Sequence, residues 1–246
     1  MGYGYGYGYG LYGLYGLWDP TFLLVIIGAI ICLIASARMR TTFNKYTRVR
    51  SMSGMNGAQT AERILRHAGI RDVRVVHIQG NLNDHYDPRN KTLSLSDSVY
   101  NSVSVAAVGV AAHECGHAIQ HAKGYVPLRI RGSLVPVANF GSTLAWPLII
   151  IGVLFGNGST NIFIEIGILL FSLAVLFQLV TLPVEFNASH RAMRLLEDTG
   201  ILGSGELRDT RKVLTAAALT YVASAAAIIL QLLRLLLLFG GRGRND

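Results

Sequence analysis

Four long runs of apolar residues dominate the pattern along the chain, at about residues 21–35, 134–155, 162–182 and 213–239. Each run approaches the roughly 20 apolar residues that a helix needs to cross the hydrocarbon core of a bilayer. The first run passes into Arg38 without a small-residue cleavage site, so we expect a retained anchor rather than a removed signal peptide. Only Gln231 and Arg234 interrupt the fourth run. The pattern predicts a mainly α-helical integral membrane protein with about four transmembrane helices.

Between the first and second runs the pattern becomes shorter and mixed. Residues 57–68 carry apolar side chains at helical spacing and end at Gly69, which predicts an amphipathic helix. Residues 73–78 and 91–96 alternate or are β-branched, which predicts two strands around a turn-rich segment. Ser96 or Ser98 is expected to cap the helix that follows. This part of the chain is predicted to be a small α+β insert.

The same pattern divides the chain into parts with different environments. They are a low-complexity Gly/Tyr tail (1–17), transmembrane helix 1 (18–37), an insert (38–130), a transmembrane hairpin (131–183), a polar segment (184–212), transmembrane helix 4 (213–240) and a tail (241–246). The Gly-Tyr repeats have no periodic apolar face, so we expect a flexible tail, and self-association through tyrosine is the alternative.

Composition and charge set the orientation. A mean hydropathy of +0.41 and a charged fraction of 15% are too apolar for an ordinary soluble domain. Apart from Arg234, Arg242 and Arg244, every Lys and Arg lies in or beside the insert and the 184–212 segment. Basic loops remain cytoplasmic, so we expect a multi-pass protein of a prokaryotic cell membrane with the insert inside. This rule accounts for the net charge of +8. No nucleic-acid partner is expected, because the sequence contains no motif that recognises DNA or RNA.

The candidate chemistry lies in the run His113-Glu114-Cys115-Gly116-His117, which small apolar residues flank on both sides. Positions i and i+4 share one face of a helix, so His113 and His117 can present two imidazoles to one metal ion. Glu114 can then reach a metal-bound water as a general base. Two histidines and a glutamate on a buried helix are costly unless something satisfies them. The motif therefore predicts a catalytic Zn²⁺ site.

A catalytic zinc usually needs a third protein ligand, and Glu185 is the best candidate. It follows the third apolar run directly after Pro183, and proline bends a helix and frees a carbonyl there. His121 is the rival, but it lies eight residues from His113, about 12 Å along a helix, which is too far for one ion. Donors to the developing oxyanion are expected among His190, Arg191 and Tyr221.

The remaining polar residues receive structural interpretations. Cys32 and Cys115 predict no disulfide framework, and Cys115 is expected to be a small buried residue on the side of the helix away from the metal. Intramembrane charges tend to pair, so Glu165 and Arg234 are expected to form an ion pair, with independent snorkelling of Arg234 as the alternative. Small residues between 216 and 227 predict close helix contact in the fourth run.

Several segments together resemble a known family, the YugP-type neutral zinc metallopeptidases of bacterial membranes, over about residues 38–239. They are Asp84-His85-Tyr86-Asp87-Pro88, Ser98-Val99-Tyr100-Asn101, the segment 110–121 and Leu182-Pro183-Val184-Glu185-Phe186-Asn187-Ala188-Ser189. The resemblance implies a zincin-like insert with a gluzincin-like ligand set: His113, His117 and Glu185 on zinc, with Glu114 as base. The related HtpX-type proteases carry a Glu-x-x-Ala-Asp pattern, where this chain has Ser189 in place of Asp. Asn187 is the candidate to replace that residue as the partner of a ligand histidine.

These observations predict an integral-membrane zinc endopeptidase that acts on membrane proteins or peptides at the cytoplasmic face. Its partners would be the lipid bilayer and a polypeptide substrate. The alternative is a catalytically silent, zinc-containing membrane scaffold, which the intact Glu114 disfavours. A transporter is a weaker alternative, because the intramembrane polar residues are scattered and no inverted repeat is evident.

Overall fold

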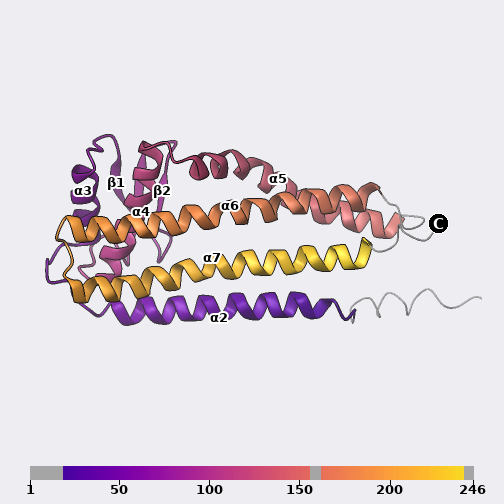
Figure 1. Cartoon of the computed structure of the whole chain (residues 1–246), viewed down its shortest axis with the longest axis horizontal. Helices are drawn as coiled ribbons and strands as arrows, with labels where there is room; N and C mark the ends of the chain where they lie inside the picture. Colours follow the sequence, from indigo (N-terminus) through magenta and orange to yellow (C-terminus); the bar gives the residue numbers. More distant parts are fainter. Residues whose placement is uncertain (1–18, 156–161, 241–246) are drawn as a thin grey trace, which may run out of the picture.

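Four long helices form an elongated bundle, and the remaining elements gather at one of its ends (Figure 1). The structure, a computed structural model, describes residues 19–155 and 162–240. The long helices are α2 (Phe22–Tyr46), α5 (Val126–Phe155), α6 (Ile162–Asp198) and α7 (Ser204–Phe239). Each is long and apolar enough to cross a membrane, as the four apolar runs predicted. The predicted Gly/Tyr tail, residues 156–161 and residues 241–246 lie outside the described residues.

The long helices extend well beyond the apolar runs that predicted them. α2 continues through Arg38 to Tyr46, and α7 begins at Ser204, before its apolar part. No proline or glycine interrupts the polar continuation of α2, so its backbone hydrogen bonding can persist past the apolar boundary. These polar extensions bring the bundle into contact with the insert.

α6 also passes through Pro183 and ends only at Asp198, so the helix does not stop at the proline. Proline removes one helical hydrogen bond, yet such residues are tolerated where neighbouring helices pack against the freed backbone. Glu185 therefore lies inside a continuous helix rather than after one.

The insert contains a short helix, a three-stranded sheet and the helix with the two histidines. These elements are α3 (Gly57–His67), β1 (Arg74–Ile78), β2 (His85–Asp87), β3 (Thr92–Ser96) and α4 (Val105–Ala122). The strand order is β1-β3-β2, with β1 parallel and β2 antiparallel to β3. The turn-rich segment thus contains an edge strand, β2, that the sequence did not predict. Three residues of mixed polarity are too few to show the alternation typical of a strand. Asp87, at the end of this strand, accepts hydrogen bonds from the Arg89 amide and the Asn90 side chain in the turn that follows.

The cap of α4 differs from the prediction. Ser104 caps the helix by accepting a hydrogen bond from the Ala107 amide at 3.2 Å. Ser96 instead ends β3 and donates its hydroxyl to Asp84, while Ser98 bonds the Ser96 hydroxyl. The intervening turn is part of the insert core, since Val99 is fully buried. The helix therefore begins later than the serine pattern indicated.

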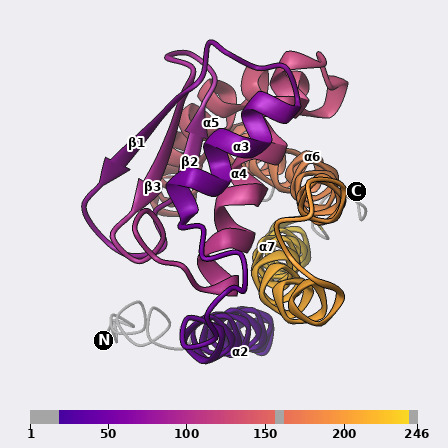
Figure 2. The same cartoon turned by 90° about the vertical axis from the view of Figure 1, so that its left-hand side faces the viewer.

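α4 lies in the centre of the insert, with the sheet and α3 on one side and α6 and α7 on the other (Figure 2). Its small residues are buried, and two of them allow close approach. A Cβ at Gly116 would lie 2.5 Å from the carbonyl oxygen of Ala188 on α6. A Cβ at Gly109 would lie 2.6 Å from the Thr210 methyl on α7. Glycine thus sets the short distance between α4 and the bundle.

α2 and α7 lie side by side along the bundle, as the small residues of the fourth run predicted (Figure 1). A Cβ at Gly28 would lie 3.1 Å from the Cα of Ala227. This packing makes the predicted Glu165–Arg234 pair wrong. Arg234 faces the start of α2, where its Nε lies 3.7 Å from Asp19 and its guanidinium 5.5 Å from the Phe22 ring. Glu165 is exposed on α6.

Candidate metal centre

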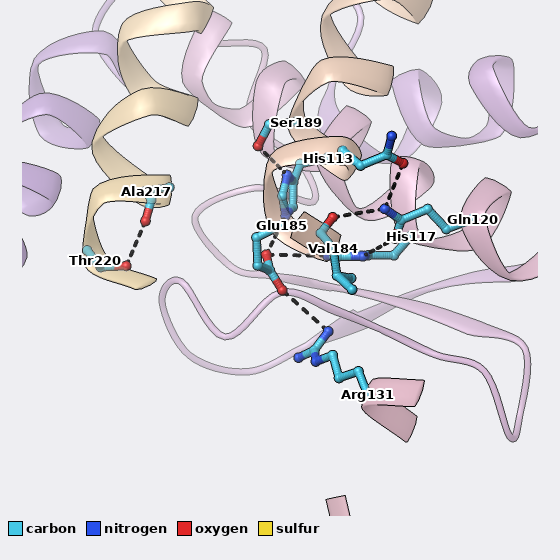
Figure 3. Close-up of polar contacts among 10 residues, drawn as sticks. His113, His117, Gln120, Arg131, Val184, Glu185, Ser189, Ala217 and Thr220 are labelled. Atoms are coloured by element: carbon cyan, nitrogen blue, oxygen red, sulfur yellow. Dashed lines mark hydrogen bonds and ion pairs between the residues drawn. The ribbon is translucent and has the colours of Figure 1, made fainter. Parts of the chain in front are cut away.

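Three side chains from two helices converge on one point beside the bundle (Figure 3). His113 and His117 come from successive turns of α4, and Glu185 comes from α6. One potential ligand atom from each lies within 4.8 Å of the others. Glu185 Oε2 is 3.3 Å from His113 Nε2 and 3.6 Å from His117 Nε2. The structure thus brings together the three ligands expected from the sequence.

The two oxygens of the Glu185 carboxylate have different surroundings. Oε1 lies 3.3 Å from Arg131 Nη1, whereas Oε2 is buried and lies at ion-pair distance from the two histidine Nε2 atoms without forming a hydrogen bond of good geometry among the described residues. A buried carboxylate oxygen that makes no good hydrogen bond is costly, and the groups that face this one are two imidazole nitrogens. Two nitrogens and one carboxylate oxygen form a ligand set of catalytic zinc. These residues therefore fit a zinc ion.

The hydrogen bonds around the histidines orient their Nε2 atoms. Gln120 donates its amide nitrogen to the carbonyl of Val184 at 2.8 Å and to Asn187 at 3.0 Å. Its amide oxygen can therefore only accept, and it lies 3.0 Å from His117 Nδ1. His117 Nδ1 must donate this bond, so in the neutral imidazole the lone pair lies on Nε2, the nitrogen that faces Glu185. Metal-binding histidines in proteins are held in the same way.

His113 is held by Ser189, whose hydroxyl lies 3.0 Å from His113 Nδ1. Asn187, the expected replacement for the missing aspartate, forms its hydrogen bonds with Gln120 and Arg191 rather than with a ligand histidine. It accepts from Gln120 and from Arg191 Nε, the latter at 2.7 Å. The serine that stands at the aspartate position therefore contacts the histidine itself. Its hydroxyl can accept from Nδ1, which keeps His113 Nε2 free for a metal.

The electrostatic environment favours positive charge. Burial lowers the pKa of His117, but the carboxylates of Glu185 and Glu114 and the Gln120 carbonyl oppose it, and the net pKa is raised. Glu114 is itself buried and lines the same cleft as His117 and Glu185, which has a volume of about 640 Å³. A carboxylate thus lies beside the three candidate ligands without belonging to their set.

Comparison of the sequence with known proteins places this chain in a family. The sequence profile of a family described as "Putative neutral zinc metallopeptidase" matches residues 21–240, which include all four long helices and the insert. The chain belongs to this family. It is also 45% identical over 226 residues to "Putative membrane protease YugP" of Bacillus subtilis (strain 168), across 91% of this chain and 99% of that protein. No solved structure matches the chain.

Membership in the neutral zinc metallopeptidase family agrees with the resemblance drawn from the sequence, and the chain is a multi-pass membrane protein. Zinc is the metal that the family name implies. The donor set of His113, His117 and Glu185 provides an independent reason for the same metal, because it rests on the coordinates of this chain.

Of the three predicted donors to the oxyanion, only one lines the cleft. Tyr221 of α7 lines the cleft together with Glu114 and Glu185. Arg191 does not line it: its guanidinium binds Asn187 and lies 5.9 Å from the Tyr125 ring. His190 lines two other hollows, neither of which contains Glu114, His117 or Glu185. Only Tyr221 is therefore placed to meet a substrate beside Glu114.

Two alternative ligands are directed elsewhere, as expected. His121 Nδ1 pairs with the hydroxyl of Tyr86 at 2.8 Å. Cys115 is fully buried and donates its thiol to the Ala61 carbonyl at 3.6 Å. Burial raises the pKa of the Cys115 thiol well above its ordinary value, so the thiolate needed for metal binding is disfavoured.

Besides Gln120, sequence reasoning missed a second residue of the site, Arg131. It lies near the start of α5, lines the cleft and forms an ion pair with Glu185. No local motif marks it, because its partner is 54 positions away in another helix. The only sequence signal is a cation placed directly before an apolar run, where a charge is normally left in water.

Proposed function

We propose that the chain is an integral-membrane zinc endopeptidase. The observation that carries the proposal is the convergence of a buried Glu185 oxygen and the Nε2 atoms of His113 and His117, with no good hydrogen bond to that oxygen among the described residues. These three residues would hold the zinc. When bound there, zinc lowers the pKa of a water to about 7 and polarises a carbonyl.

Glu114 acts as the general base and acid of this reaction. It follows the first histidine, is buried and lines the cleft beside the ligands. Its carboxylate accepts the proton of the attacking water and then delivers it to the leaving amine of the cleaved peptide bond. A purely structural zinc site has no use for a carboxylate in this position, which argues against a silent scaffold.

Tyr221 and Arg131 provide the remaining polar groups of the cleft. Tyr221 donates its hydroxyl to the oxyanion that develops on the carbonyl oxygen. Arg131 binds one oxygen of Glu185 at 3.3 Å and so orients the other toward the two histidines. Arg131 is a positioning residue, because its contact is with a ligand rather than with the substrate.

The substrate is a polypeptide in extended form. β2 is an edge strand, since it pairs only with β3, and its residues His85 and Tyr86 line the cleft. The free side of an edge strand can pair with the main chain of an extended peptide. This arrangement would lay a scissile bond across the cleft toward Glu114.

The site faces the cytoplasm of a prokaryotic cell. The support is the charge distribution, because nearly all cations lie in or beside the insert and the 184–212 segment. Glu185 lies where α6 leaves its apolar part, so the cleft adjoins the membrane surface. Substrates are therefore membrane proteins or peptides at that surface.

The decisive experiment compares zinc content and cleavage of casein or a membrane peptide by the detergent-purified wild type and Glu114→Gln. Glu62→Gln, an exposed glutamate on α3, is the matched control. We expect one zinc per chain in all three proteins and loss of cleavage only in Glu114→Gln. Retained cleavage by that variant would refute the base assignment. Zinc without cleavage in the wild type would favour the scaffold.

A further inference from the structure

A second hollow lies between α2 and α7. The C-terminal end of α2 and the N-terminal end of α7, which form it, lie at the end of the bundle that carries the insert (Figure 1). The volume of the hollow is about 560 Å³, and it shares no lining residue with the cleft that Glu114, His117 and Glu185 line. Cations and hydroxyls line it: Arg38, Lys45, Arg208, Arg211 and Lys212, with Thr41, Thr42 and Thr215. We call this hollow the basic groove.

The cations of the basic groove are poorly neutralised by the protein. Within residues 19–155 and 162–240, Lys212 pairs with Asp209 at 2.8 Å, and none of the other four cations has an acidic partner within ion-pair distance. Lys45 and Lys212 both approach the Tyr46 ring, at 5.5 and 5.6 Å. Like charges gathered in one hollow repel each other, and a bound anion would relieve that repulsion.

The groove also lies at the boundary between apolar and polar parts of both helices. Arg38 follows the apolar part of α2 directly, and Thr215 and Ala216 lie near the start of the apolar part of α7. A ligand in the groove would therefore meet cations on one side and membrane hydrocarbon on the other. Basic pockets between helices on the cytoplasmic side are typical binding sites for anionic lipid headgroups.

We propose that the basic groove binds the phosphate group of an anionic phospholipid. Guanidinium groups bind phosphate oxygens through paired, charge-assisted hydrogen bonds, and threonine hydroxyls can donate to the same oxygens. Free phosphate has the same headgroup chemistry, but the position of the groove beside the apolar helix parts favours the lipid. The binding is independent of zinc and of peptide cleavage.

Native mass spectrometry of the full-length protein in detergent tests the proposal, with phosphatidylglycerol and phosphatidylcholine as competing probes. The test variant is Arg38→Gln with Arg211→Gln. The matched control is Arg71→Gln with Arg74→Gln, two exposed arginines of the insert, which removes the same charge elsewhere. We expect the wild type and the control to retain phosphatidylglycerol preferentially. The test variant should bind it at least about tenfold more weakly, given the attraction of each juxtamembrane cation for anionic lipid.

Two further arms keep the result interpretable. Arg38→Lys with Arg211→Lys keeps the charge, so it should keep the preference and would show that the groove tolerates substitution. Inorganic phosphate at millimolar concentration should not displace phosphatidylglycerol. Equal binding of both lipids by the wild type, or an unchanged preference in the Gln variant, would overturn the proposal. Displacement by inorganic phosphate would overturn the lipid assignment.

Discussion

At the scale of single residues, Gln120 links the histidine helix to α6. Its side-chain amide is hydrogen-bonded to His117 on one side and to the Val184 carbonyl and Asn187 on the other. The side chain is fully buried. Because both donors are used, the amide cannot turn over without losing two hydrogen bonds. It therefore fixes the tautomer of His117 and the position of the Glu185 helix at the same time.

Gln120→Ala is expected to weaken zinc binding by about 10–100-fold, the usual loss when the partner of a ligand histidine is removed. The imidazole would lose its fixed orientation, and α6 would lose a contact one residue before Glu185. Competition with a chromophoric chelator measures the affinity. Gln79→Ala, an exposed glutamine of the insert, is the control and should bind zinc like the wild type. Equal affinities for Gln120→Ala and the wild type would contradict this role.

At the scale of elements, the distance between α4 and α6 decides whether two helices can form one site. The structure achieves it with Gly116, where an added Cβ would lie 2.5 Å from a backbone oxygen. A backbone atom cannot move aside as a side-chain end can, so any larger residue must separate the helices. Glycine is thus required here by contact rather than by backbone conformation.

Gly116→Ala should destabilise the fold by about 1–3 kcal/mol through overpacking. For a chain of this size, that corresponds to a decrease in Tm of roughly 3–10 °C. Zinc affinity should fall with it, because His113 and His117 move away from Glu185. Thermal unfolding in detergent measures the first effect. Gly205→Ala is the control, since its Cβ would meet nothing closer than Arg208 at 3.9 Å. A decrease in Tm shared by both variants would reject the argument.

The elements also show what the sequence can and cannot predict. His113 and His117 could be placed from spacing alone, because the i to i+4 relation is local to a helix. The four apolar runs predicted the four long helices for the same reason. Arg131 and Ser189 could not be assigned their contacts, since their partners Glu185 and His113 come from other elements. The strand β2 was not predicted, because it is defined by its pairing with β3 and not by a pattern in its own residues.

At the scale of the whole molecule, the two ends of the bundle differ in charge. The insert lies at one end of the bundle (Figure 1). Residues at that same end line both the cleft beside His117 and Glu185 and the basic groove. Arg234 is the only Lys or Arg of α7 that lies far from that end, and it pairs with Asp19 near the start of α2. An asymmetry of this kind orients membrane proteins with the basic end inside.

Cysteine labelling in intact bacterial cells that express the chain can test this orientation. The background carries Cys32→Ala and keeps Cys115, which is fully buried and has a raised thiol pKa. Asn81→Cys would place a thiol on the exposed surface of the insert, and Asn245→Cys would place one near the C-terminus. A membrane-impermeant maleimide should label Asn245→Cys in intact cells and Asn81→Cys only after permeabilisation.

The unmodified background should remain unlabelled in both conditions, which would confirm that Cys115 does not react. The reverse labelling pattern would place the insert outside the cell and refute the cytoplasmic orientation. It would also separate the orientation from the chemistry, because the contacts among His113, His117 and Glu185 do not depend on which side of the membrane they face. The orientation decides which polypeptides the cleft can meet, whereas the ligand geometry decides what can be done to them.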